Sequence, residues 1–254
     1  MKTDSPTQQL TLPVNLKQEI TFNNFYGEAN TKAATILQRL IVEQNETLIY
    51  IAGPNGSGKT HLLISALAYL EELNVSVCYF SLKDLFEHLL EPSEMQNFFE
   101  SLGSYSMVIL DDLDAAFQNR SKESPSSEID AILAFEKSLF NLFNLFKMTG
   151  QQLLLSAKPV PGQLNVELPD LASRLKSGLL INLIAMNDMQ KEQFLQTVAL
   201  QKGLSLDEGL SAYIIKRSGR DLRELLSVLE TLDQASLSEK RKLSVPFAKK
   251  ILNW

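Results

Sequence analysis

Residues 47–60 read TLIYIAGPNGSGKT, and this stretch decides the fold. Its first half is a short apolar run rich in residues that favour β-structure, so it predicts a buried strand that ends at Gly53. Residues 53–60 match the pattern G-x-x-x-x-G-K-[ST] at every fixed position. In such a loop the glycines let backbone N–H groups surround phosphate oxygens, and the following helix adds the positive end of its dipole. The stretch therefore predicts a phosphate-binding loop between a strand and a helix that begins near Thr60.

Strands and helices alternate along the chain around this loop. Apolar residues at helical spacing predict helices at 30–44 and 129–148, and between them we expect a helix near 83–90 followed by an irregular stretch to residue 104. Further apolar runs predict strands at 75–82, 106–112, 151–159 and 177–185. This alternation favours parallel β-α-β units with right-handed crossovers and helices on both faces of the sheet.

The pattern changes after residue 188, where we expect no strand. Amphipathic helices are predicted at 188–202, 206–217, 220–236 and 244–253. The predicted fold class is therefore α/β, in which a P-loop domain with a five-stranded parallel sheet is followed by a small all-helical lid domain. The predicted boundaries are 1–20 for a flexible tail, 21–186 for the nucleotide-binding domain and 187–254 for the lid.

The composition is that of an ordinary globular protein of 254 residues, with 44% hydrophobic and 21% charged residues. The net charge is −6 and the isoelectric point is near 5.1. Because proteins that hold duplex DNA by themselves usually carry a basic face, this balance argues against DNA as the primary ligand. One Cys and two His argue against a disulfide framework and a Cys/His metal site. No apolar leader or membrane-spanning run is seen, so we expect a cytoplasmic protein that binds no membrane.

Two acidic residues follow the third predicted strand. Residues 107–110 are apolar and run into Asp111 and Asp112. By the logic of phosphoryl-transfer sites, Lys59 would reach the β- and γ-phosphates and Thr60 would hold Mg²⁺. Asp111 would hold the same ion through water, and Asp112 would orient the attacking water. Buried strands also run into acidic turns that have no such role, so the pair gains its meaning from the loop upstream. The predicted cofactor is ADP or ATP with Mg²⁺.

Two arginines are candidates for a transition-state clamp. Arg174 lies in LPDLASRLKSG at 168–178, and Arg223 lies in GRDLREL at 219–225. A guanidinium that faces a γ-phosphate stabilises the charge of the transition state and is worth ~10³–10⁵ in rate. Arginines in surface ion pairs, worth only ~0–1 kcal/mol, fit the same sequence. The residues alone leave both interpretations open.

The order of these motifs, with the ending RKLSVPFAKKILNW, resembles the AAA+ family of the bacterial replication initiator DnaA, and more closely its regulators of the Hda type. The resemblance covers nearly the whole chain, including ITFNNFYGEAN at 20–30. The initiator itself would continue into a C-terminal helix-turn-helix domain, whereas this sequence stops at Trp254. We therefore expect DNA to be contacted only indirectly, in agreement with the acidic isoelectric point.

The resemblance implies roles for single positions. Asp111 matches the Mg²⁺ acid of the family, and Asp112 matches the acid beside it. Arg174 matches the arginine finger that is presented to a neighbouring subunit's nucleotide, and Arg223 matches the lid arginine that senses nucleotide, with Arg220 as the fallback. Phe25 and Tyr26 fall where the family approaches the adenine base. The other implied nucleotide contacts are Gly53, Pro54, Asn55, Gly56, Ser57, Gly58, Lys59, Thr60, His61 and Ser156.

One position departs from the family pattern. Relatives often place an Asp just before the basic residue and proline that follow the fourth strand, and here Ala157 precedes Lys158 and Pro159. Ser156 is then the only nearby polar candidate for sensing phosphate. This departure argues against efficient ATP hydrolysis by the chain alone.

The tail segment QLTLPV at 9–14 resembles the short peptide by which replication proteins dock on the sliding clamp, the beta subunit of DNA polymerase III. Leu10, Leu12 and Val14 would each contribute ~1.5–3 kcal/mol on burial. Pro13 limits the conformations lost on binding, and the Gln9 amide can both donate and accept hydrogen bonds. The alternative is a linker that covers this protein's own core.

The resemblance implies a regulator of replication initiation, a DNA replication inhibitor. Docked on the clamp, it would present Arg174 to the ATP site of DnaA, stimulate hydrolysis there and so inactivate the initiator. The alternative is an autonomous AAA+ ATPase that acts as a helicase or transposition loader, which the complete loop favours and which Ala157 and the tail oppose. The sequence leaves open whether the protein forms a homo-oligomer. It also leaves open partner contacts of residues 113–128 and of the aromatic helix 129–148, although core packing is the better interpretation of that helix.

Overall fold

The computed structural model describes residues 20–25, 28–88, 91–117, 126–218 and 222–254. These residues fall into two compact units, of which the first contains the described residues up to Pro54 with those of Gly58–Ile184, and the second contains Asn55–Ser57 with the described residues of Ala185–Trp254. The tail motif at 9–14 lies outside the described residues, and so do Tyr26 and Arg220.

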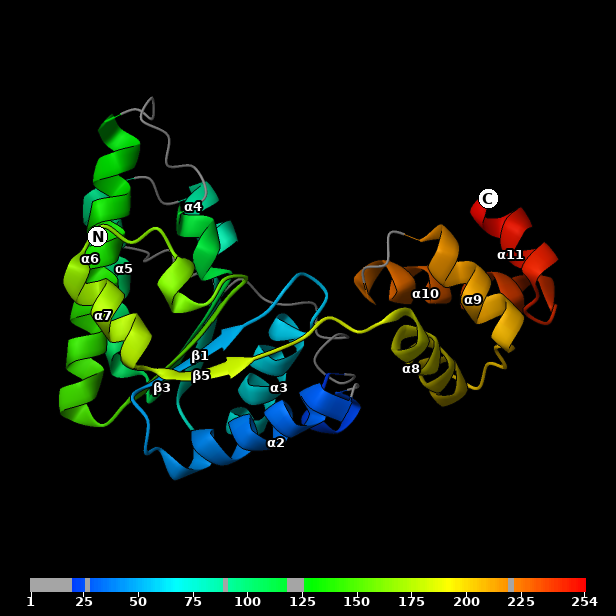
Figure 1. The fold of residues 1–254 in the computed structure, drawn as a ribbon, viewed down its shortest axis with the longest axis horizontal. Helices are drawn as coiled ribbons and strands as arrows, with labels where there is room; N and C mark the ends of the chain where they lie inside the picture. Colours follow the sequence, from blue (N-terminus) through cyan, green and yellow to red (C-terminus); the bar gives the residue numbers. More distant parts are fainter. Residues whose placement is uncertain (1–19, 26–27, 89–90, 118–125, 219–221) are drawn as a thin grey trace, which may run out of the picture. The chain divides into compact units, whose positions relative to one another are not determined.

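A parallel sheet forms the centre of the first unit (Figure 1). It has five strands in the order β2-β3-β4-β1-β5. The strands are β1 Leu48–Ala52, β2 Val77–Ser81, β3 Met107–Asp111, β4 Gln152–Ala157 and β5 Leu179–Asn182. The predicted α/β fold with a parallel sheet and a following helical domain is confirmed. Because the strands are parallel, the loops after β1, β3 and β4 all leave from the same edge of the sheet.

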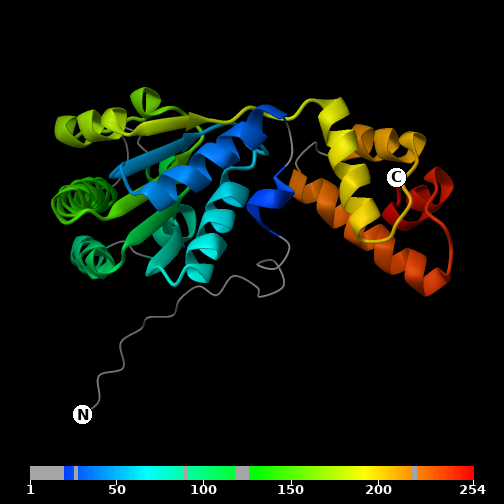
Figure 2. The same cartoon turned by 90° about the horizontal axis from the view of Figure 1, so that it is seen from below.

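Helices cover both faces of this sheet, and in Figure 2 the sheet lies between α2 with α3 and α5 with α6. The helices of this unit are α2 Glu28–Glu43, α3 Lys59–Glu72, α4 Leu82–His88, α5 Pro92–Ser101, α6 Ser126–Thr149 and α7 Pro169–Ser177. All five residues of β1 are buried, and Tyr50 and Ile51 point into different apolar clusters on opposite faces. Burial on both faces explains why this strand reads as a continuous apolar run.

Helix α5 occupies the stretch that we expected to be irregular, so that expectation was wrong. Pro92 sits in its first turn, where a missing N–H costs no hydrogen bond. Met95 and Phe99, one turn apart, are buried against the core. The ten residues of this helix hold only three large apolar side chains, Met95, Phe98 and Phe99, and these are too few to show a helical period.

The second unit is built from helices α8 Asp188–Gln201, α9 Glu208–Arg217, α10 Leu222–Glu239 and α11 Val245–Leu252. Side-chain caps begin three of them: Asn187 accepts from Gln190 N–H, Asp207 from Leu210 N–H and Ser244 from Phe247 N–H. Their apolar stripes form a core of their own that includes Leu195, Ile214, Leu225 and Leu229. In the described part of the chain, none of the helices has the length and apolar character needed to cross a bilayer.

Candidate functional site

The phosphate loop at 53–60 connects β1 to α3. Gly56 and Gly58 have positive φ angles of 73° and 97°, a region that residues with a side chain rarely adopt. Gly58 also faces Phe25, because a Cβ atom at position 58 would lie 2.6 Å from Cε2 of that ring. A side chain at position 58 is therefore opposed both by the backbone conformation and by the aromatic neighbour.

Phe25 lies beside this loop because the segment before α2 contacts His61 of α3. Its buried ring has its centroid 5.2 Å from that of His61. Nε2 of His61 lies 3.1 Å from the Thr21 carbonyl oxygen and donates to it when it carries the proton. Burial lowers the pKa of His61 below its usual value, and the hydrogen bond to Thr21 opposes part of this shift. The arrangement holds an aromatic face at the start of α3, where the sequence predicts contact with a base.

Lys59 begins α3, and only 8% of its surface is exposed. Its ammonium group donates to the carbonyl oxygens of Gly53, at 2.8 Å, and Pro54, at 3.2 Å. The cation therefore lies over the start of the loop that contains it. An ammonium group has three rotatable donors, so it can exchange these carbonyls for phosphate oxygens.

Asp111, at the end of β3, is the centre of a buried polar cluster. Oδ2 accepts hydrogen bonds from Thr60 Oγ1, at 2.7 Å, and from the Tyr79 hydroxyl, at 3.0 Å. Oδ1 accepts from the Ser156 hydroxyl and from the N–H of Asp112, the latter at 2.9 Å. With 1% of Asp111 exposed, these donors replace water around the carboxylate. The structure thus brings together Thr60, Asp111 and Ser156, and adds Tyr79, which sequence reasoning missed.

Asp112 turns the chain away from the sheet. Its φ angle is 56°, in the left-handed region, and its N–H lies 3.3 Å from Ser156 Oγ as well as bonding Asp111. Strained backbone of this kind in a residue other than glycine is often found at functional sites. The turn places the Asp112 side chain just beyond the cluster, half-buried at the same edge of the sheet.

The oxygens of this cluster fit a magnesium ion. Mg²⁺ prefers hard oxygen ligands and usually binds one or two protein oxygens together with phosphates and waters. Thr60 Oγ1 and Asp111 Oδ2 supply two such oxygens side by side. Among the described residues no cluster of three or more His, Cys, Asp and Glu side chains could hold a metal by itself. The donor set therefore suits an ion that arrives with a nucleotide.

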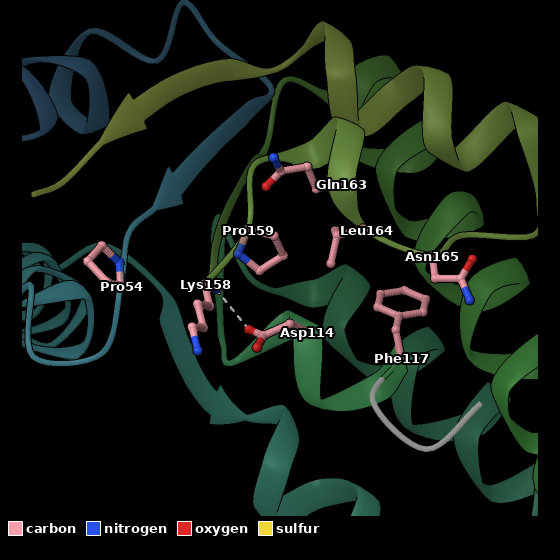
Figure 3. Close-up of a pocket in the computed structure, with 8 residues that line it drawn as sticks. All are labelled: Pro54, Asp114, Phe117, Lys158, Pro159, Gln163, Leu164 and Asn165. Carbon is pink, nitrogen blue, oxygen red and sulfur yellow. Dashed lines mark hydrogen bonds between the residues drawn. The ribbon is translucent and has the colours of Figure 1, made fainter. Parts of the chain in front are cut away.

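Residues after β4 line a cavity of about 550 Å³ at the same edge (Figure 3). Ser156 points to Asp111, whereas the side chain of Ala157 is fully buried in the core on the opposite side of the strand. The backbone N–H of Lys158 donates to Asp114, at 3.0 Å, across the cavity wall. The cavity is lined by Pro54, Asp114, Phe117, Lys158, Pro159, Gln163, Leu164 and Asn165.

The Tyr50 side chain supports this wall from within the sheet. Its hydroxyl donates to the carbonyl oxygen of Pro159, at 2.9 Å. Burial, with a smaller contribution from the carboxylate of Asp114, raises the pKa of Tyr50 well above its usual range. The phenol therefore keeps its proton and remains a donor at every physiological pH.

Arg174 lies in the last turn of α7. Its guanidinium carbon is 5.5 Å from the centroid of the Phe143 ring on α6, and the residue is half-buried. Among the described residues, no carboxylate pairs with it and no contact joins it to the Asp111 cluster. Phe143 and Phe146 of α6 pack in the core. Arg223 lies in the first turn of α10, in the second unit.

Comparison with known proteins identifies both parts of the chain. Residues 16–182 match the family model of the bacterial DnaA ATPase domain, and residues 188–252 match that of the Hda lid domain. A protein of Haemophilus influenzae, itself uncharacterised, is 36% identical over 252 residues, which cover 97% of this chain and 99% of that protein.

Solved structures share the fold. Domain III of the Thermotoga maritima replication initiation protein DnaA matches with a TM-score of 0.75 at 20% identity, over 92% of this chain and 96% of that one. AMPPCP-bound DnaA from Aquifex aeolicus matches with a TM-score of 0.65 at 19% identity, over 87% of this chain and 67% of that one. From these matches, the chain belongs to the AAA+ family of the bacterial replication initiator DnaA and carries the lid domain of its Hda-type replication regulators.

Proposed function

We propose that this chain binds ADP or ATP with Mg²⁺ at residues 53–60 and acts on a neighbouring molecule, the initiator DnaA, whose ATP hydrolysis it stimulates. Arg174 would supply the finger to the ATP site of DnaA. The tail segment at 9–14 would hold the protein on the DNA sliding clamp. The outcome is an initiator converted to its ADP form, and so inactivated.

The Asp111 cluster supports the nucleotide part of this proposal. Lys59 would hold phosphate oxygens, while Thr60 and Asp111 would hold Mg²⁺ directly or through water. Phe25 offers an aromatic face beside the same loop. Bound Mg²⁺ would neutralise phosphate charge, and the residues that would hold the nucleotide all belong to this chain.

The position of Arg174 is the observation that carries the proposal of action on a partner. Its guanidinium lies over an aromatic ring rather than in an ion pair with any described residue, so its charge is available to an incoming anion. It also makes no contact with the chain's own Asp111 cluster in the described residues. A cation held in this way suits the developing charge of a γ-phosphoryl group on another molecule.

The test is hydrolysis of ATP by purified DnaA, measured with clamp loaded on DNA and this protein at saturating ADP. We expect Arg174→Ala to lower the stimulated rate by about 10³-fold or more, because the finger acts in the transition state. ADP binding and clamp binding should remain at the level of the unchanged protein.

Arg39→Ala is the matched control. Arg39 is an exposed arginine on α2 that pairs with Glu43 four residues later, at 3.3 Å, and its loss should leave stimulation unchanged. Full stimulation by the Arg174→Ala variant would refute the finger role.

A second candidate function is an autonomous ATPase, which the complete cluster of Thr60, Asp111 and Ser156 within one chain favours. Hydrolysis measured without any partner separates the two. A rate that rises with this protein's own concentration supports the autonomous ATPase, and a rate that requires both DnaA and loaded clamp supports the regulator.

A further inference from the structure

Two side chains of helix α6 contact α7, which carries Arg174, and the residues that lead into it. The helices α6 and α7 are in contact in the first unit (Figures 1 and 2). Glu136, in the middle of α6, is fully buried. Its Oε1 accepts from the N–H of Glu167, at 3.1 Å, and its Oε2 accepts from the N–H of Leu168, at 2.7 Å. Both carboxylate oxygens of Glu136 are thus directed at the start of α7.

Leu168 is the N-cap residue of α7, and its side chain has no oxygen to cap the helix. Helices are usually capped by a Ser, Thr, Asp or Asn at this position, whose side-chain oxygen accepts from an N–H of the first turn. Glu136, 32 residues before Leu168 in the chain, does not replace such a cap, because it accepts from the N–H groups of the two residues that precede the first helical residue. A negative charge at this end of α7 also matches the helix dipole. The two hydrogen bonds therefore fix the segment that enters α7 relative to α6.

Phe143 makes the second contact, seven residues after Glu136 on α6. Seven residues are about two helical turns, so both side chains leave the same face of α6. The Phe143 ring lies beneath the Arg174 guanidinium, at 5.5 Å from its centroid. A cation over an aromatic face at this distance is attracted to it. One helix therefore fixes both the start of α7 and its finger side chain.

We infer that Glu136 and Phe143 are positioning residues for Arg174. This inference rests on the proposed function of Arg174 as a finger, and it assigns to α6 the task of holding the guanidinium in one orientation before the partner arrives. Pre-organisation of this kind matters because a misplacement of about 1 Å costs about 100-fold in rate. Neither residue touches nucleotide, and both act through Arg174.

The test uses the full chain with DnaA, ATP and DNA-loaded clamp, and separates the maximal stimulated rate from the half-saturating concentration. Glu136→Gln has the same shape but one acceptor oxygen in place of two, and its NH₂ group would face an N–H donor. We expect it to lower the maximal rate by about tenfold to 100-fold. The half-saturating concentration and ADP binding should stay unchanged. Phe143→Leu should act in the same direction, and neither change should lower the rate further in an Arg174→Ala background.

Matched controls distinguish positioning from general destabilisation. Phe146→Leu removes a fully buried ring from the same helix, and Gln152→Leu removes a buried amide that donates to the carbonyls of Leu40 and Glu46. Both should lower the melting temperature while leaving the maximal rate unchanged below the melting transition. A direct readout is the Nε–H signal of Arg174 in NMR spectra, which Phe143→Leu and Glu136→Gln should shift and the two controls should not.

The outcomes separate the inference from the function on which it rests. Full stimulation by Arg174→Ala removes the finger itself. Loss of stimulation in Arg174→Ala, with unchanged maximal rates in Glu136→Gln and Phe143→Leu, overturns the positioning role alone. The positioning role is also overturned if the maximal rates of Phe146→Leu and Gln152→Leu fall as much as those of Glu136→Gln and Phe143→Leu.

Discussion

Asp111 gathers donors from several parts of the chain at a single carboxylate. Thr60 comes from the phosphate loop, Tyr79 from β2 and Ser156 from β4. The motif at 53–60 identifies Thr60. The apolar run at 107–110 identifies Asp111, which follows it directly. No pattern marks Tyr79, because its hydroxyl reaches the cluster only after β2 pairs with β3. At the residue scale, then, the sequence supplies the motif and the fold completes the set of donors.

Gly58 gives the sharpest prediction at this scale. Gly58→Ala would require a side chain at a φ of 97° and a Cβ atom 2.6 Å from Phe25. We expect it to weaken ADP binding by at least about tenfold and to lower stability by more than about 1 kcal/mol, because the native φ is one that alanine rarely adopts. Titration with a fluorescent ADP analogue and thermal unfolding measure the two effects.

Gly150→Ala is the control for this change. Gly150 has a φ of 78°, but among the described residues no non-neighbouring atom lies within 4 Å of the added Cβ. It directly follows α6 and lies far along the chain from the loop. It should lose stability through backbone strain and bind ADP normally. Normal ADP binding by Gly58→Ala would show that the ring contact has no part in the site.

Gly178 lies between α7 and β5, where the chain passes close to Leu48 of β1 and leaves no room for a side chain. Its backbone lies in an ordinary region, yet an added Cβ would be 2.6 Å from Leu48 Cγ and 3.1 Å from the Leu48 carbonyl oxygen. The side-chain-free position lets the chain leave α7 and enter β5 directly beside β1. At the element scale, this glycine and the α6–α7 contacts set where α7 lies against the sheet.

Gly178→Ala is therefore expected to destabilise the fold by about 1–3 kcal/mol, the usual cost of overpacking a close contact. Urea unfolding should show a lower midpoint with an unchanged slope. Gly162→Ala is the comparison, because its nearest neighbour would be Lys176 Cε at an ordinary 3.8 Å. Equal midpoints for the two variants would contradict the packing argument.

Net charge is a property of the whole molecule that bears on how it reaches its partner. At −6, the chain has no excess of positive charge with which to bind the DNA polyanion. A short docking peptide offers another way, since binding to a loaded clamp raises the local concentration of everything attached to it. The proposed regulator therefore depends on its tail for location and on Arg174 for chemistry.

The double change Gln9→Ala with Leu10→Ala should abolish capture of the protein by immobilised clamp. It removes an amide with both donor and acceptor groups and one apolar anchor. ADP binding should be unchanged, and stimulation of DnaA should become independent of the clamp and weak. Gln8→Ala, one residue before the motif, is the matched control and should be captured normally. Retained capture of the double variant would exclude this tail segment as the docking peptide.

The sequence by itself determined the strand, loop and helix of residues 47–60, the parallel α/β sheet and the helical region after residue 188. These features depend on local spacing, which a chain displays before it folds. Helix α5 was not predicted, because its two buried residues are too few to make a periodic signal.

The tertiary structure alone decided that the Ser156 hydroxyl reaches Asp111, that Tyr79 joins them, and that Glu136 holds the segment that leads into α7. Each of these contacts joins residues 31 to 45 positions apart in the chain. Their geometry follows from strand order and helix packing, and those are settled by burial of apolar surface across the whole first unit.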